Sequence, residues 1–78
     1  MDLNELISKK LKGLRAENSY SLDDVANKIG LHRETIRRYE NNPYIMNVDI
    51  LLKLLEIYQI NVNVFFEEIY GKMPYINN

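Results

Sequence analysis

The sequence predicts an all-α domain of five short helices around a single core. An apolar residue, a polar capping residue and a second apolar residue five positions after the first recur at five places, and this spacing is typical of the hydrophobic staple at a helix start. Between these starts apolar residues recur at helical spacing, and no segment alternates as a half-buried strand does. The five staples are Met1, Asp2 and Leu6; Tyr20, Ser21 and Val25; Leu31, His32 and Ile36; Met46, Asn47 and Leu51; and Ile60, Asn61 and Phe65.

The composition narrows the class of protein. The 78 residues make one small domain, and the absence of cysteine excludes disulfides and thiolate metal sites, which fits a reducing cytoplasm. No apolar run approaches the roughly 18 residues that span a bilayer, and the acidic start lacks the basic region of a signal peptide. The sequence contains neither a glycine-rich phosphate loop nor a cluster of metal ligands. We therefore expect a cytoplasmic protein that is not an enzyme and has no metal, no cofactor and no membrane contact.

The first helix is expected over residues 3–17. Its inward face comprises Leu3, Leu6, Ile7, Leu11 and Leu14. Gly13, inside the helix, costs about 1 kcal/mol relative to alanine. Asn18 and Ser19 end the helix, and Asn18 is able to take a left-handed conformation.

The next two helices differ in how much apolar surface they can bury. Leu22, Val25, Ala26 and Ile29 stand at i, i+3, i+4 and i+7, which is one apolar face of a short helix. Gly30 then supplies the freedom for a sharp turn. The following helix, residues 32–41, has only two large apolar residues, Ile36 and Tyr39, which predict its buried side. Its other side carries polar residues, namely Arg33, Glu34, Arg37, Arg38 and Asn41.

The fourth and fifth helices are expected over residues 48–58 and 62–70. Gly71 then ends the regular structure. We therefore expect a domain at residues 1–70 followed by a tail at residues 71–78. The inward side chains are Leu51, Leu54, Leu55 and Tyr58 in the fourth helix, and Phe65 and Ile69 in the fifth.

The segment from Ser21 to Asn42 resembles the helix-turn-helix of the Cro/C1-type (XRE family) repressors. That family typically reads S-Q-E-E-L-A, then G-V-S, then E-N-G; this chain reads S-L-D-D-V-A from Ser21, G-L-H from Gly30 and E-N-N from Glu40. With the helices on either side, the resemblance covers roughly residues 3–69. It implies a five-helix lambda-repressor-like DNA-binding domain, although the net charge of −1 does not by itself indicate a nucleic-acid partner.

The resemblance implies a sequence-specific double-stranded DNA-binding transcriptional regulator, with the helix at residues 32–41 in the major groove. There arginine can read guanine, and glutamate can accept from cytosine. The implied base-reading residues are Arg33, Glu34, Thr35 and Arg38. Phosphate contacts are expected from His32, Arg37, Asn41, Tyr44 and Asn47. A second interpretation of Glu34 and Arg38 is an i, i+4 ion pair on an exposed face.

Three positions depart from the family pattern. Leu22 replaces the common glutamine at the start of the second helix, and Pro43 with Tyr44 replaces a basic turn. Asn42 replaces the usual glycine but can still adopt a positive φ. The family also pairs an arginine of the first helix with a glutamate of the third, which here implies a partly buried ion pair between Arg15 and Glu40.

The same resemblance implies a repressor that binds a palindromic operator as a homodimer. The expected dimer interface comprises Ile57, Val64, Phe66 and Tyr70, with Met73, Tyr75 and Ile76 of the tail adding apolar surface. Alternatively, the tail covers Ile50 and Ile57 within one chain. The alternative function is a protein-interaction module or an antitoxin with the same fold and weak or no independent DNA binding, whose partner would be a protein such as a toxin or an antirepressor.

Overall fold

The computed structural model describes residues 2–71, and its regular structure is entirely helical over that range. The predicted all-α fold of five α-helices is therefore confirmed, and one short 3-10 helix follows the third. In chain order the elements are α1 (Leu3–Glu17), α2 (Leu22–Ile29), α3 (Arg33–Asn41), η1 (Pro43–Ile45), α4 (Val48–Ile57) and α5 (Val62–Tyr70). The tail expected at residues 71–78 falls outside the described residues after Gly71, and so do Met73, Tyr75 and Ile76.

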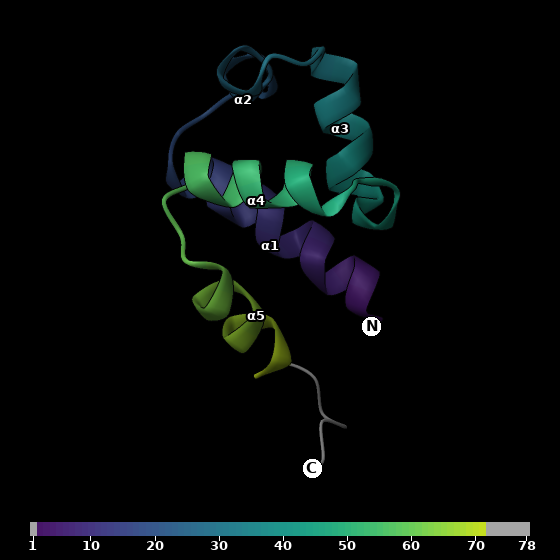
Figure 1. The fold of residues 1–78 in the computed structure, drawn as a ribbon, viewed down its shortest axis with the longest axis vertical. Coiled ribbons are helices and arrows are strands. Elements are labelled where there is room, and N and C mark those ends of the chain that lie inside the picture. Colours follow the sequence, from purple (N-terminus) through teal and green to yellow (C-terminus); the bar gives the residue numbers. More distant parts are fainter. Residues whose placement is uncertain (1, 72–78) are drawn as a thin grey trace.

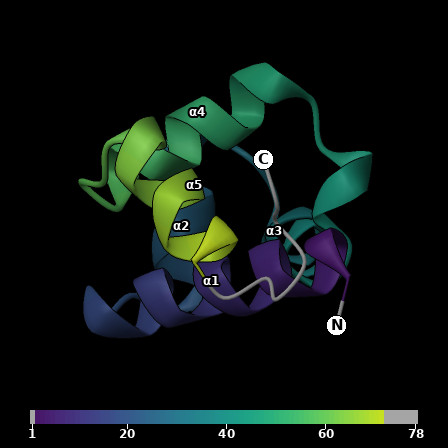
Figure 2. The same ribbon diagram turned by 90° about the horizontal axis from the view of Figure 1, so that it is seen from below.

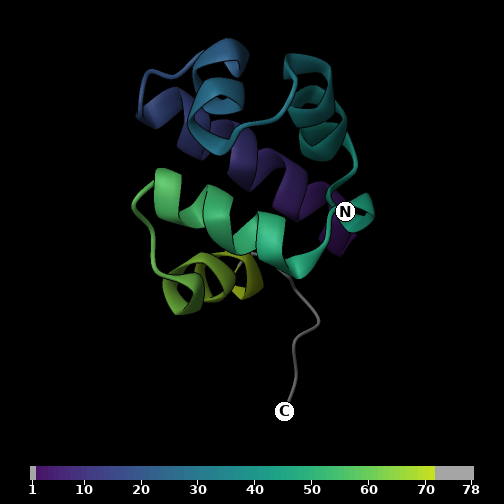
Figure 3. The ribbon, with the colours of Figure 1, turned by 45° about the horizontal axis from the view of Figure 1, so that its top comes forward.

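The helices form two groups on either side of the long first helix. Figure 1 shows α2 and α3 at one end of the molecule and α5 at the other, with α4 crossing in front of α1. Figure 3 shows α1 running between the α2–α3 pair and the α4–α5 pair. Seen from below, α5 lies between α1 and α4 (Figure 2). The α2–α3 pair is therefore presented at the end of the molecule remote from α5.

Side chains cap four of the five α-helix starts, as the staple pattern predicts. At α2 the bond is reciprocal, because the Ser21 hydroxyl accepts from the Asp24 amide while the Asp24 carboxylate accepts from the Ser21 amide. His32 stands at the N-cap of α3 and makes no side-chain capping bond; the helix begins at Arg33, one residue later than expected. The other caps are Asp2, Asn47 and Asn61.

Asn18 and Asn42 can each adopt a positive φ, but neither does so in the structure. Asn18 has φ −86°, because its side-chain amide stays on the helix and donates to the Leu14 carbonyl at 2.8 Å. The left-handed residue is instead Ser19, with φ 58°. Asn42 has φ −145°, because a residue that precedes proline is restricted to extended conformations, and Pro43 follows it.

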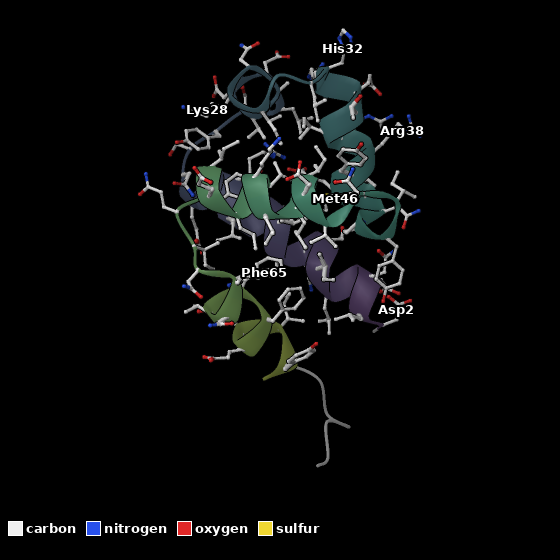
Figure 4. All side chains as sticks on the ribbon, viewed as in Figure 1. Asp2, Lys28, His32, Arg38, Met46 and Phe65 are labelled. Atoms are coloured by element: carbon white, nitrogen blue, oxygen red, sulfur yellow. The ribbon has the colours of Figure 1, made fainter. Side chains whose placement is uncertain are left out.

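The core joins all five α-helices, and Phe65 of α5 lies within it (Figure 4). On α3 the expected buried side is only partly correct. Ile36 is fully buried, but Tyr39 is half-buried and Glu40 takes the second buried position with 3% exposure. The buried apolar side chains are Ile7, Leu11, Leu14, Val25, Ala26, Ile36, Leu54, Leu55, Tyr58, Phe65 and Ile69.

Glu40 can be buried because α1 supplies partners for it. Arg15 donates to its carboxylate from Nε at 2.6 Å and from Nη2 at 3.3 Å, and the Ser8 hydroxyl donates to its backbone carbonyl. The remaining guanidinium nitrogen of Arg15 donates to the Tyr20 carbonyl at 3.1 Å. The hydrogen bonds to Glu40 raise the pKa of Arg15. This pair therefore joins α1 to the C-terminal end of α3, with both charges satisfied.

Tyr58, the residue directly after α4, lies close to this pair. Its hydroxyl is buried and has no hydrogen-bond partner among residues 2–71. Burial raises the pKa of Tyr58 above its usual value of 10.0, and the charge of Glu40 raises it further. The ring packs beside Tyr20, with the two ring centroids 6.4 Å apart. Tyr58 thus fills the core with its ring while its hydroxyl is left unsatisfied.

We expect Glu40→Ala to lower the free energy of unfolding by about 3 kcal/mol, because it leaves the Arg15 guanidinium without its acceptor. Urea unfolding followed by circular dichroism measures the change. Glu67→Ala, an exposed acid on α5, is the matched control and should stay within about 0.5 kcal/mol of wild type. Equal unfolding midpoints for Glu40→Ala and wild type would show that the Arg15–Glu40 ion pair does not stabilise the fold.

We expect Tyr58→Phe to be as stable as wild type at neutral pH or up to about 1 kcal/mol more stable, since it removes an unpaired buried hydroxyl. Because the pKa is raised on folding, the unfolded chain ionises first, and wild type should lose stability as the pH rises above about 10. The Tyr58→Phe variant should lose less stability over the same pH range. Tyr20→Phe is the control in the same urea titrations and should keep the alkaline loss of wild type; a Tyr58→Phe variant with that same loss would refute this account.

Candidate DNA-binding surface

The turn between α2 and α3 sets the position of α3. Gly30 adopts φ 80°, a left-handed conformation that glycine takes without strain. The amides of Gly30 and Leu31 both donate to the Ala26 carbonyl, at 2.9 and 3.0 Å. Val25 and Ala26 are buried beneath this turn. The chain therefore reverses tightly and places α3 against α2.

The outer face of α3 is polar and exposed. Arg38 points away from the body of the protein, and His32 at the start of α3 and Lys28 of α2 stand at the same end of the molecule (Figure 4). Among the expected base-reading residues, only Thr35 is half-buried. The exposed residues of α3 are Arg33, Glu34, Arg37, Arg38 and Asn41. Three of the four residues that the sequence assigns to base reading, Arg33, Glu34 and Arg38, thus lie exposed on one short helix.

Glu34 pairs with Arg37, and not with Arg38 as the second interpretation held. Arg37 donates to the Glu34 carboxylate from Nε at 3.0 and 3.2 Å and from Nη2 at 2.8 Å. Residues three apart on a helix are neighbours just as residues four apart are, and the planar guanidinium matches both carboxylate oxygens. These hydrogen bonds hold the pKa of Glu34 below its usual value of 4.5, and the charge of Arg37 lowers it further.

Arg33 also faces an acid, on the preceding helix. Its Nε lies 3.7 Å from Oδ1 of Asp23, and both side chains are more than half exposed, so the attraction is weak and screened by salt. Within the described part of the chain, Arg38 is the arginine of α3 with no ion pair. An approaching phosphate must therefore compete with Asp23 and Glu34 for two of the three guanidinium groups.

The turn after α3 carries the remaining expected phosphate contacts. Tyr44 is 62% exposed, and its backbone amide donates to Oδ1 of Asn4 at 3.0 Å. Asn47 uses Oδ1 to cap α4 through the Ile50 amide at 2.8 Å, so its amide nitrogen is the atom that remains to donate. Asn41 is exposed at the end of α3. These groups lie along the chain directly after the polar face of α3.

Sequence reasoning missed Asn4 and Asp23. Asn4, Ser8 and Arg15 stand at i, i+4 and i+11, which places them along one face of α1, and each donates a hydrogen bond to α3 or to the residue after it. That polar stripe beside the buried Leu11 was a detectable signal. Asp23 has no comparable signal, because its approach to Arg33 depends on how α2 and α3 cross.

Three of the expected dimer residues, Val64, Phe66 and Tyr70, lie on α5, whereas Ile57 is the last residue of α4 and lines a hollow with Lys28 and Ile29 of α2. Val64 and Tyr70 are 42% and 45% exposed, whereas Ile57 and Phe66 are half-buried against the core. The Phe66 ring lies 6.0 Å from that of Tyr70. The structure adds a second group of exposed apolar side chains, which sequence reasoning did not identify: Ile45, Val48 and Leu52.

Comparison with known proteins assigns the family. The helix-turn-helix sequence profile matches residues 11–65, which is more than half of the chain. The chain therefore belongs to the helix-turn-helix family of the Cro/C1 type, a class of DNA-binding domains. The matched range contains α2, the Gly30 turn, α3, η1 and α4, together with the C-terminal part of α1.

Two curated relatives come from Pyrococcus horikoshii and Pyrococcus abyssi. Each is provisionally named an HTH-type transcriptional regulatory protein and is 36% identical to this chain over 50 residues. The match covers 64% of this chain but only 16% of each relative, so the likeness concerns one segment of a longer protein. No solved structure matches the chain significantly.

Membrane-spanning helices and metal-binding clusters are both absent from residues 2–71. Over residues 2–71 no helix has the length and apolar character needed to cross a membrane. In the same range no three or more His, Cys, Asp or Glu side chains gather in a way that could hold a metal ion.

We expect the pKa of Glu34 to lie below 4.5 and to rise towards that value in Arg37→Gln, because the variant loses the hydrogen bonds to the carboxylate. The pairing with Arg37 is present above this pKa and is lost as the pH falls through it. Arg38→Gln is the matched control, since it removes the same charge without removing a hydrogen bond to Glu34. Carbon NMR titration of the Glu34 carboxylate measures its pKa in wild type and in both variants. An equal change in the pKa of Glu34 in the two variants would show that its hydrogen bonds to Arg37 do not form in solution.

Proposed function

We propose that this chain is a sequence-specific double-stranded DNA-binding transcriptional regulator, with α3 entering the major groove. One observation carries the proposal: the tight Gly30 turn presents a short helix whose exposed face holds Arg33, Arg37 and Arg38 at one end of the molecule. A helix of this kind fits the major groove, where its side chains reach base edges. The family and the names of the two relatives support the same function.

The geometry supports distinct roles for the three arginines. Arg38 extends outward with no ion pair among the described residues and is proposed to read a base, with Arg33, Glu34 and Thr35. Arg37 is proposed to contact phosphate, assisted by His32, Asn41, Tyr44 and Asn47. In the unbound protein Glu34 neutralises Arg37, which lowers the attraction for DNA of any sequence. Attraction to phosphate is the sequence-independent part of DNA binding. We therefore expect low affinity for random DNA and a clear preference for one DNA sequence.

We further propose a repressor that binds a palindromic operator as a homodimer through α5. One helix of nine residues contacts only a few base pairs, so a second copy about 34 Å away, one turn of DNA, extends the site. The exposed apolar side chains Val64 and Tyr70, with the half-buried Phe66 and Ile57, support this interface. Because α5 lies at the end remote from α3, an interface there leaves the polar face of α3 uncovered.

Selection of bound duplexes from a random pool at stated salt tests the function. We expect a palindrome to be enriched, and Arg38→Ala to weaken binding to it by about 1–3 kcal/mol while relaxing one base-pair preference. Arg37→Ala should weaken selected and random duplexes alike and flatten the salt dependence. Lys10→Ala removes a positive charge that pairs with Glu68 on α5, away from α3, and is the control.

The outcomes separate the candidate functions. Equal losses on selected and random duplexes for Arg38→Ala would refute its role as a base reader. Enrichment of a single half-site, with sedimentation of a monomer in the presence of DNA, would refute the homodimer. No enrichment at all would refute the main proposal and favour the protein-interaction module or antitoxin, which the exposed apolar side chains on α4 and α5 also fit.

A further inference from the structure

Asn4 of α1 is bonded to two places in the segment that follows α3. Its Nδ2 donates to Oδ1 of Asn42 at 2.8 Å, and its Oδ1 accepts from the Tyr44 amide at 3.0 Å. Both contacts bridge about forty positions of sequence, because Asn4 is the second residue of α1 and the bonded groups flank Pro43. Figures 1 and 3 both place the N-terminal end of α1 beside the connection from α3 to α4.

This segment needs a partner from outside because it cannot cap itself. Asn42 stands at the N-cap of η1 but makes no side-chain capping bond, and its extended backbone follows from Pro43. The Tyr44 amide, near the start of η1, would otherwise lack an acceptor within the helix. Asn4 supplies that acceptor and also occupies the Asn42 side chain. One residue of α1 thus caps a helix that lies far away in sequence.

A second hydrogen bond from α1 is made to the C-terminal end of α3. The Ser8 hydroxyl donates to the Glu40 carbonyl, which is one of the carbonyls left without a partner at the end of α3. Asn4 and Ser8 are one helical turn apart on α1. They therefore hold Glu40, near the end of α3, and the start of η1 against a single helix.

We infer that Asn4 is a positioning residue for DNA contact by the turn from Asn42 to Tyr44. The inference rests on the proposed function, in which Tyr44 reaches phosphate. The turn lacks the glycine and the basic residues that the family pattern has there, so contact depends on where a neutral, 62% exposed tyrosine is held. Asn4 fixes that position before DNA arrives, and less conformational freedom is lost on binding.

A double-mutant cycle on DNA binding tests the inference. The variants are Asn4→Ala, Tyr44→Phe and both together, each bound to the duplex selected by wild type and to a random duplex. We expect Asn4→Ala to weaken the selected duplex by about threefold to tenfold without changing the salt slope, because it removes hydrogen bonds and no charge. Tyr44→Phe should weaken binding in the wild-type background and have no further effect in Asn4→Ala.

A measurement without DNA keeps the two proposals separable. Hydrogen exchange of the Tyr44 amide should be faster in Asn4→Ala and slow again in Asn4→Asp, which keeps an acceptor oxygen. The matched control is Asn63→Ala, the same change at the second residue of α5, which should leave exchange and binding within about twofold of wild type.

Different results would overturn the positioning role of Asn4 and the proposed DNA-binding function. Independent effects of Asn4→Ala and Tyr44→Phe on binding, or wild-type affinity in Asn4→Ala, would overturn the inference while the proposed function stands. A Tyr44 amide that exchanges equally fast in wild type and Asn4→Ala would overturn the positioning itself. A wild-type protein that binds no duplex, with the amide still protected by Asn4, would overturn the proposed function and with it the DNA role of Asn4.

Discussion

The placement of α3 depends on the ion pair between Arg15 and Glu40. Ile36 is the only apolar side chain of α3 in the core, and a nine-residue helix with one apolar anchor is not fixed by burial alone. Glu40 provides a second fixed point, since its carboxylate accepts from Arg15 and its carbonyl from Ser8. Both donors belong to α1, the longest helix, which also contacts α5 and η1. Breaking the pair would leave a buried charge unpaired and release the exposed face of α3 from its orientation.

Acidic side chains lie beside the exposed arginines of α3. With few apolar residues to bury, α3 can devote its outer side to arginine, and acids on α2 and α3 limit the repulsion between these charges. Glu34 engages Arg37 at close range, while Asp23 lies at a looser distance from Arg33. Such pairs contribute little to stability because they are exposed. Their nearby carboxylates would compete with any anion that approaches Arg33 or Arg37.

The two ends of the molecule carry different kinds of surface. The α2–α3 end exposes charged side chains, whereas exposed apolar side chains lie on η1, α4 and α5. Between them lies a core whose only unsatisfied buried side-chain atom, among residues 2–71, is the Tyr58 hydroxyl. The core therefore lies between the charged side chains exposed on α2 and α3 and the apolar side chains exposed on α4 and α5.

Local patterns in the sequence determined the helices, because capping residues, staples and apolar spacing act within a few residues. Ser21, Gly30 and the apolar face of α2 all behave as those patterns require. The pairing of Arg15 with Glu40 was expected only through the family resemblance. Only the tertiary structure decided which partners the charged and polar groups of α3 and its turn take. Glu34 meets Arg37, Asp23 meets Arg33 and Asn4 caps η1, since each contact depends on rotamers or on helix crossings that no local spacing specifies.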